Sequence, residues 1–449
     1  MFIAVVMSLI LAACGSSDDE TTTTAAAAGE STTTAAAEET TTTEASMEPV
    51  TIQLWHHFTP EVEQQAMQDL ADRFHELHPN VTIEVTVVGS GDMATKTNTA
   101  MQANEPPDIF SGWGGASLGN YVDAGLVQDL TDELAVDGWV DEFLPGPLAL
   151  YTLDGRSYGV PIRAGAWGLW IDKDLFAEAG IDGCPTLWSD FIDDVVALQD
   201  AGITPLAIGA KDQWTTAGWW EYLSIRAASA DEVAATATLT NRTGSWTAEP
   251  FVLAGDMISE LVALEPFQDG YQGASYDEQL SLAANGEVAM TFDGWWGTTW
   301  ISSAGTDPEA TIARLGFCPF PAIEGAPGDP TDVMGTGNGF SLGRDAPPEA
   351  VDFLRFITSP EEYPALVENG FAAPPVIVGM DSLVTDPNTI EIIELGGAAP
   401  HFNAEWNQSL GPVVGVVMVE QAAALINGAT TGQAAAQAIE DAMQVAVGS

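Results

Sequence analysis

Residues 50–88 read VTIQLWHHFTPEVEQQAMQDLADRFHELHPNVTIEVTVV. The run VTIQLW is short and rich in β-branched residues, as a buried strand is, and NVTIEVTVV alternates as a second strand. The segment between them carries large apolar residues at helical spacing: Met67, Leu70, Phe74 and Leu77. A strand, a helix and a strand in this order predict a right-handed crossover and therefore an α/β fold.

The same alternation continues along the chain of 449 residues, a length that favours two lobes plus tails. PPDIFSGW (106–113) predicts a strand that runs into a glycine-rich loop, and such loops collect ligands at the carboxyl ends of strands. TLWSDFIDDVVALQDAG (186–202) predicts a helix in the second lobe. Amphipathic helices are predicted late in the chain at 348–370 and 432–447.

Negative charge dominates the composition. Lys and Arg number 11 against 65 Asp and Glu, so the formal net charge is -54. This charge repels nucleic acid and anionic membrane surfaces, so we expect neither as a partner. Because 46% of residues are hydrophobic and 14 are Trp, the chain is not of the disordered acidic class. We expect acidic residues to coat a globular body.

The amino terminus, MFIAVVMSLILAACGSS, carries an apolar run too short to span a bilayer, followed by small residues and Cys14. It predicts an export signal over residues 1–13. The motif LAAC resembles the bacterial lipobox, in which the cysteine after the cleaved signal is lipid-modified. In a plain signal peptide, by contrast, Cys14 is only a small apolar residue.

Residues 14–47 are mainly Thr, Ala, Ser and Glu without bulky apolar side chains beyond the terminal Met47. Burial cannot offset the entropy of ordering such a segment, so we interpret it as a disordered tether. With a lipid on Cys14, the protein is expected on the extracellular face of the cell membrane. The lipid anchor would be its only membrane contact.

Five sequence segments carry information through their order along the chain: LWHHFTPEVEQQAMQDLADRFHELHPNVTIEV, PPDIFSGWGGASLGNYVDAGLVQDLTD, YGVPIRAGAWGLWIDKDLFAEAGI, GEVAMTFDGWWGTTW and GTGNGFSLG. Together they resemble the family 1 extracellular solute-binding proteins, the carbohydrate receptors of ATP-binding-cassette (ABC) importers. The likeness spans about residues 48–449. It implies a monomer that captures a neutral sugar or oligosaccharide and delivers it to the permease subunits in the membrane.

The resemblance also implies a periplasmic-binding-protein-like fold, with two α/β lobes joined at a hinge. Lobe 1 would comprise residues 48–162 and 320–382, and lobe 2 residues 163–319 and 383–449. The chain would cross between the lobes near residues 161–163, 317–319 and 380–385.

A neutral sugar has C–H faces that pack on aromatic rings and hydroxyls that need donors and acceptors. The phrase FDGWWGTTW supplies both kinds of group. The resemblance puts Trp296 on the ligand, and Asp293 is expected to accept hydrogen bonds from its hydroxyls. Trp295 and Trp300 fit packing in the core or between the lobes equally well.

A second aromatic phrase, GAKDQWTTAGWWEY, puts Trp214 where family members present a ring to the sugar. Lys211 and Asp212 are possible polar partners. Trp219 and Trp220 are neighbours on a predicted helix, so only one of them could face the cleft. Ordinary packing is the favoured interpretation for this pair.

Further candidates come from the strand ends, the hinge and the end of the chain. They are His57, Trp113, Arg163, Trp167, Asn338 and Trp406. His57 could equally be an ordinary surface or core histidine whose hydrogen bonds are made within the protein. For Asn338, a Gly-Asn-Gly turn with positive φ is an equally good explanation.

Enzymatic interpretations are weak. Paired carboxylates arise by chance in so acidic a chain, so they say little about glycoside hydrolysis, although a secreted carbohydrate hydrolase stays the alternative from another class. GTGNGF lacks the Lys of a phosphate loop, and His75 and His78 lack a third metal ligand. We therefore expect no cofactor and no metal.

Two questions stay open in the sequence. A receptor of the same fold for a non-sugar solute is a further alternative, although few Lys or Arg lie near the site phrases to bind phosphate. Cys184 and Cys318 could form a disulfide in an exported protein, but their geometry cannot be derived from sequence.

Overall fold

The computed structural model describes residues 48–448. The proposed signal, Cys14 and the whole of the proposed tether lie outside these residues. Within 48–448, none of the helices has the length and apolar character required to cross a membrane.

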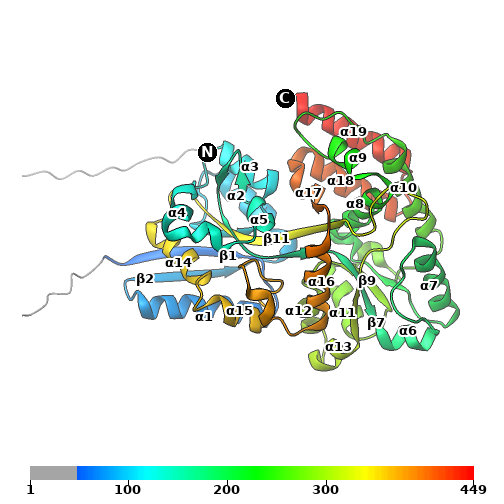
Figure 1. Ribbon diagram of the computed structural model, residues 1–449, viewed down its shortest axis with the longest axis horizontal. Coiled ribbons are helices and arrows are strands. Elements are labelled where there is room, and N and C mark those ends of the chain that lie inside the picture. Colours follow the sequence, from blue (N-terminus) through cyan, green and yellow to red (C-terminus); the bar gives the residue numbers. More distant parts are fainter. Residues whose placement is uncertain (1–47, 449) are drawn as a thin grey trace, which may run out of the picture. The chain divides into compact units, whose positions relative to one another are not determined.

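The opening strand–helix–strand prediction is confirmed. β1 (Val50–His56) pairs in parallel with β2 (Val81–Val87), and α1 (Glu61–Leu77) connects them and lies along the pair (Figure 1). The predicted apolar stripe of α1 is buried as far as Phe74. Leu77, the last residue of the helix, is 65% exposed. The buried stripe therefore ends one turn earlier than the spacing of apolar residues predicted.

The first sheet extends beyond this pair. β1 also pairs in parallel with β3 (Ile109–Gly112), which pairs antiparallel with the long strand β11 (Val333–Leu342). β11 in turn pairs with β6 (Val160–Ala166) and β12 (Phe402–Ala404). The helical segments of the first lobe are α2 (Ser90–Gln102), α3 (Gly115–Asp123), α4 (Thr131–Ala135), η1 (Val136–Glu142), α5 (Pro145–Ala149), α14 (Pro348–Ile357), α15 (Tyr363–Glu368) and η4 (Met380–Leu383), with the hairpin β4 (Thr152–Leu153) and β5 (Arg156–Ser157).

The second sheet has the strand order β10-β7-β9-β8. Its strands are β7 (Gly168–Asp172), β8 (Leu206–Ala207), β9 (Met290–Asp293) and β10 (Leu315–Cys318). The helical segments of the second lobe are α6 (Lys173–Ala179), α7 (Trp188–Asp200), η2 (Ala210–Asp212), α8 (Trp214–Ala227), α9 (Ala230–Thr236), α10 (Glu249–Val262), η3 (Tyr271–Gly273), α11 (Tyr276–Ala284), α12 (Gly297–Ala304), α13 (Pro308–Arg314), α16 (Pro387–Ala398), α17 (Trp406–Ser409), α18 (Gly411–Ile426) and α19 (Gly432–Gly448).

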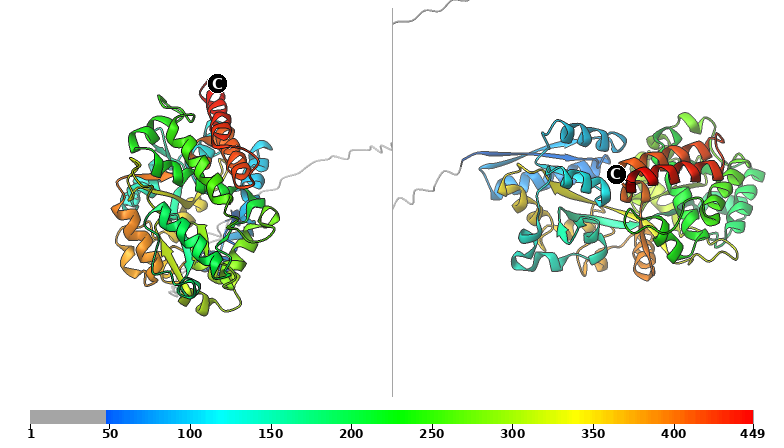
Figure 2. Two further views of the ribbon diagram at one scale, coloured as in Figure 1. Left: turned by 90° about the vertical axis from the view of Figure 1, so that its right-hand side faces the viewer. Right: turned by 90° about the horizontal axis from the view of Figure 1, so that it is seen from above.

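Two paired strands run from one lobe to the other. On β6, Ile162 packs in the core of the first lobe, and Ala166 packs in a cluster of the second. On β11, Phe340 belongs to the first core and Met334 to the second. The antiparallel pair β6–β11 therefore joins the two lobes, as Figure 2 shows from above.

The position of one crossing differs from the expected one. The resemblance put it near residues 317–319, yet Phe320 stacks on Tyr222 in the second core, with ring centroids 4.5 Å apart. The chain passes to the first lobe later, along β11. The third passage lies between Val384, in the first core, and Ile392, in the second lobe.

The structure excludes one of the two explanations offered for Asn338 and corrects one predicted helix. The Gly-Asn-Gly segment forms no turn: Asn338 lies inside β11, at a register shift between Asn338 and Gly339. The single helix expected over 348–370 is two helices, α14 and α15. Pro360 lies between them, and a proline cannot continue the hydrogen-bond ladder of a helix.

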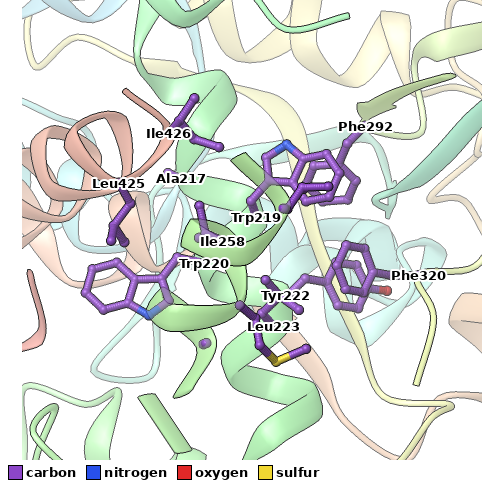
Figure 3. Close-up of a cluster of buried hydrophobic side chains, with 14 of the residues drawn as sticks. Ala217, Trp219, Trp220, Tyr222, Leu223, Ile258, Phe292, Phe320, Leu425 and Ile426 are labelled. Atoms are coloured by element: carbon purple, nitrogen blue, oxygen red, sulfur yellow. The ribbon is translucent and has the colours of Figure 1, made fainter. Parts of the chain in front are cut away.

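The core of the second lobe is built around α8 (Figure 3). Trp219 and Trp220 are both buried there, as the packing interpretation favoured. Trp219 packs on Phe292 of β9, and the indole nitrogen of Trp220 donates a hydrogen bond of 2.9 Å to the carbonyl of Phe251 on α10. The sheet, α8 and α10 thereby share one apolar core.

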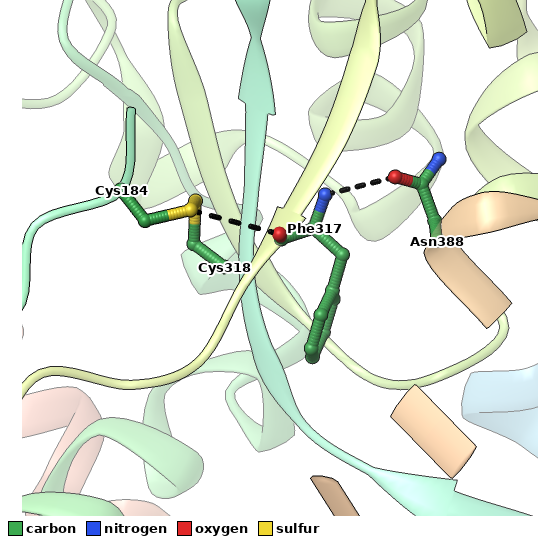
Figure 4. Close-up of a disulfide and its surroundings, with 4 residues drawn as sticks. All are labelled: Cys184, Phe317, Cys318 and Asn388. Carbon is green, nitrogen blue, oxygen red and sulfur yellow. Dashed lines mark hydrogen bonds between the residues drawn. A yellow bond between two sulfur atoms is a disulfide. The ribbon is translucent and has the colours of Figure 1, made fainter. Parts of the chain in front are cut away.

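Cys184 and Cys318 form a disulfide, with their Cα atoms 5.5 Å apart (Figure 4). It ties the loop between α6 and α7 to the end of β10. Next to it, the backbone N–H of Phe317 donates to Asn388 of α16 at 3.0 Å. The contact of 3.7 Å from the Cys184 sulfur to the Phe317 carbonyl is not donated by sulfur, because a disulfide sulfur carries no hydrogen.

The double variant Cys184→Ala/Cys318→Ala is expected to lose about 4–5 kcal/mol of unfolding free energy, because the bond closes a loop with a separation of 134 residues. Denaturant unfolding measures the loss. The wild type under reducing conditions is the matched control and should lose a similar amount. An unchanged unfolding midpoint in both would contradict the prediction.

Candidate functional site

A cavity of about 470 Å³ lies where the two lobes meet. Its floor comes from the connecting strands β6 and β11, and its walls come from both lobes. The residues that line it include the following predicted ones: His57, Trp113, Arg163, Trp167, Trp214, Trp296 and Asn338. The cavity therefore gathers residues from distant parts of the sequence.

One side of the cavity is an aromatic wall, formed by Trp167, Trp214, Trp296 and Trp300. The rings of Trp167 and Trp296 meet edge to face with centroids 5.3 Å apart. Trp214 lies 5.9 Å from Trp167 and 6.4 Å from Trp296. Trp214 and Trp296 are half-buried, so each keeps part of its ring available to a ligand.

The indole nitrogen of Trp296 is already used inside the protein. It donates to the hydroxyl of Tyr276 at 2.6 Å, and that hydroxyl donates to Asp293 at 2.8 Å. Asp293 is fully buried and does not line the cavity, so it orients Tyr276 rather than meeting a ligand as expected. Burial raises the pKa of Asp293 to about 7, against the opposing effect of the hydrogen bonds that it accepts.

The cavity floor holds a buried ion pair. Arg163 Nη1 lies 2.7 Å from Glu63 Oε1, and Nη2 lies 3.0 Å from Oε2, with both side chains at most 1% exposed. Trp300 donates to the same carboxylate at 3.1 Å. The other guanidinium contacts are to the Phe371 carbonyl at 2.7 Å and to Asn338 Oδ1 at 3.3 Å.

The first lobe contributes the ends of two parallel strands. His57 follows β1 and Trp113 follows β3, and their ring centroids are 4.7 Å apart. Burial and then the charge of Arg163 hold the pKa of His57 well below its usual value, so the ring is neutral. Gly114 has φ +74°, and a Cβ there would lie 2.2 Å from the Leu150 carbonyl, so only glycine fits beside Trp113.

A buried carboxyl group lies at the rim of the cavity. Glu405 lines the cavity and accepts a hydrogen bond of 2.6 Å from the indole nitrogen of Trp167. Burial, and next the neighbouring Glu221, raise the pKa of Glu405 to about 8. Glu405 is therefore largely protonated at neutral pH, and its carboxyl can donate as well as accept.

Trp406 is a predicted site residue that does not line the cavity. Its ring packs against Trp246 in the second core at 5.1 Å, and its backbone N–H donates to Glu221 at 2.8 Å. The two tryptophans that flank Trp296 differ in position. Trp300 lines the cavity, whereas Trp295 packs on Arg163 and is buried.

Sequence reasoning missed the polar residues of the cavity. Neither Lys211 nor Asp212 lines it; the neighbouring Gln213 does. The other missed polar residues are Thr95, Asn98, Ser117, Tyr276, Glu405, Asn407, Gln408 and Glu420. Several of them lie on the helices that follow a strand end, and that position is the signal that could have found them. Within residues 48–448, no cluster of His, Cys, Asp or Glu is arranged to hold a metal.

Comparison with known proteins gives the family. The model of the bacterial extracellular solute-binding proteins matches residues 59–364, so this chain belongs to that family, whose members bind solutes. An uncharacterised ABC transporter extracellular-binding protein of Pyrococcus horikoshii is 23% identical over 279 residues, which are 60% of this chain and 60% of that protein. The multiple sugar-binding protein of Streptococcus mutans is 23% identical, over 67% of this chain and 66% of that protein.

The fold is also that of solved structures. A structure from a study of xylan utilisation by Caldanaerobius polysaccharolyticus has a TM-score of 0.80 and 26% identity, and the match covers 87% of this chain and 99% of that one. The predicted two-lobed α/β fold is thereby confirmed.

Glu63→Gln is expected to lower the unfolding free energy by about 3–5 kcal/mol, because it leaves the Arg163 charge buried without its partner. Denaturant unfolding measures the change. Glu362→Gln is the matched control: it breaks the more exposed pair with Arg73 and should cost less than about 1 kcal/mol. Equally small losses of unfolding free energy in the two variants would contradict the importance of the buried Glu63–Arg163 pair for stability.

Glu405→Gln is expected to flatten the dependence of stability on pH. Because the folded pKa of Glu405 is raised to about 8, the unfolded chain releases this proton first. The stability that Glu405 contributes is full below its ordinary pKa and is lost as pH rises through 8. Thermal melts from pH 5 to pH 9 test this, with the exposed Glu361→Gln as control. Parallel curves for wild type and Glu405→Gln would contradict it.

Proposed function

We propose that this chain is the extracellular receptor of an ABC-type sugar importer. It captures a neutral sugar or oligosaccharide between its lobes and delivers it to the permease in the membrane. A lipid on Cys14, outside the described residues, anchors it to the outer face of the cell membrane. Of the nine predicted residues, the seven that line the cavity are proposed to contact the ligand, and Asp293 and Trp406 are proposed to support them from behind the cavity surface.

The observation that carries this proposal is the aromatic wall. Trp214 and Trp296 offer partly exposed ring faces in a concave site, and Trp113 offers a third from the opposite lobe. Such rings pack on the C–H faces of a pyranose. The missed polar residues then supply donors and acceptors for its hydroxyls.

Charge supports a neutral ligand. Among the described residues that line the cavity, Arg163 is the one permanent cation, and Glu63 neutralises it. His57 is neutral, while Glu420 adds a further acidic group to the lining. An anionic solute would find no unpaired cation here, and anions need charge-assisted donors.

The relatives support the same class of ligand. The Streptococcus mutans protein is named for binding multiple sugars, and the Caldanaerobius polysaccharolyticus structure comes from work on xylan utilisation. We extend sugar binding from them to this chain as part of the proposal. Incubation with neutral glycans separates it from the hydrolase alternative, since a receptor leaves the glycan unchanged and an enzyme cleaves it.

Trp296→Ala is expected to weaken sugar binding at least tenfold, a change of about 1.4 kcal/mol, because the ligand loses a ring face. Isothermal titration calorimetry measures the affinity, using the sugar that gives the largest thermal shift in a panel of neutral glycans.

Trp188→Ala is the matched control, because Trp188 packs on Phe191 and Phe320 outside the cavity. It should lower stability through a core cavity and leave affinity unchanged. We expect Trp300→Ala to act mainly on stability, since its nitrogen bonds to Glu63. Unchanged affinity in Trp296→Ala would defeat the proposal.

A further inference from the structure

A second, smaller cavity adjoins the main one in the first lobe. It has a volume of about 120 Å³ and lies between α2, α3 and the end of β3. We call it the side cavity. Ala94, Asn98, Trp113 and Ser117 line both cavities, so the two adjoin at these residues. The side cavity therefore lies next to the space that a ligand in the main cavity would fill.

The walls of the side cavity are mainly apolar. Met93, Phe110, Leu118 and Tyr151 line it, and all are buried. The hydroxyl of Tyr151 is not available to a ligand, because it donates to the Gly112 carbonyl at 2.6 Å. A ligand group that enters must therefore present mostly apolar surface.

Some of the polar side chains in the lining are engaged within the protein: Asn120 donates to the Ala116 carbonyl at 3.0 Å, and Ser117 donates to Gln408 Oε1 at 3.4 Å. The hydroxyl of Ser111 is bonded to His57 at 2.8 Å. Thr97 lies in the wall, 4% exposed, and its hydroxyl has no hydrogen-bond partner among residues 48–448. At the junction, Asn98 accepts a hydrogen bond from Tyr121 at 2.6 Å through Oδ1, which leaves its amide hydrogens to donate outward.

These lining residues indicate which chemical group fits the side cavity. A sugar ring would bring several hydroxyls into an apolar chamber, where each unpaired hydroxyl costs free energy. A single water needs two to four polar partners to be held well. An acyl group suits the chamber better: its methyl meets the apolar wall, and its one carbonyl oxygen accepts from Thr97 or Asn98.

Resting on the proposed function, we propose that the side cavity is a subsite for an acetyl group, carried on the captured sugar as an amide or an ester. The ligand class is then an acetylated oligosaccharide. Trp113 separates the two compartments, with the sugar ring in the main cavity and the acetyl group in the side cavity.

Matched neutral pairs of ligands test the proposal by calorimetry on the full exported chain. One pair is N-acetylated chitotetraose and cellotetraose, which share backbone and linkage and differ at C2. A second is O-acetylated xylotetraose and the same sugar after mild alkaline deacetylation. In at least one pair the acetylated member should bind about tenfold or more tightly than its partner.

Two variants assign that preference to the side cavity. Leu118→Phe fills it and should reduce the affinity for the acetylated member to that of the free sugar, which itself stays unchanged. Thr97→Val keeps the volume and removes the hydroxyl, so it carries the test if Leu118→Phe fails to fold. It should weaken only the acetylated member, by severalfold.

Equal affinities within every pair, or a preference that survives both variants, would overturn the acetyl subsite and leave sugar binding standing. Absence of binding by either member of every pair would count against sugar binding itself, and the subsite would fall with it.

Discussion

The ion pair between Glu63 and Arg163 fixes the floor on which the cavity is built. Glu63 comes from α1 of the first lobe and Arg163 from the connecting strand β6, while Trp300 of the second lobe donates to the same carboxylate. Removing two charges from water costs several kcal/mol for each. The pair is tolerable here because the Phe371 carbonyl and Asn338 accept further guanidinium hydrogens, and aromatic rings, including Phe58, cover its faces.

The neutral character of the cavity follows from this floor. Glu63 neutralises the charge of Arg163. Burial, and next the nearby Arg163, lower the pKa of His57, so its ring is uncharged. On the opposite side, burial raises the pKa values of Glu405 and Asp293, which favours their neutral forms. A strongly acidic protein therefore lines this cavity mainly with rings and uncharged hydrogen-bonding groups, and the exposed Glu420 is the acidic exception in the lining.

The sequence predicted the parts of this molecule that follow from local pattern. The βαβ opening, the helix over 188–200 and the placement of His57 and Trp113 at strand ends rest on periodicity and on the geometry of parallel sheets. Long-range partners were not predictable in the same way. Nothing local indicates that Glu63 meets Arg163, or that Asp293 turns inward to Tyr276. Of the two explanations for Asn338, the turn failed because pairing with β6 imposes an extended backbone that the Gly-Asn-Gly triplet alone does not indicate.

Three rings of the aromatic wall have no N–H left for a ligand. The nitrogens of Trp167, Trp296 and Trp300 donate to Glu405, Tyr276 and Glu63. This part of the wall offers flat ring faces and no hydrogen-bond donor, so the proposed sugar would meet it through a C–H face. Under the proposed function, hydrogen bonds to the hydroxyls of the ligand would come from other groups in the lining, such as Asn98 and Ser117 on helices α2 and α3. If that function holds, substitutions on these two helices would alter the hydrogen-bonding groups of the site without repacking its aromatic interior.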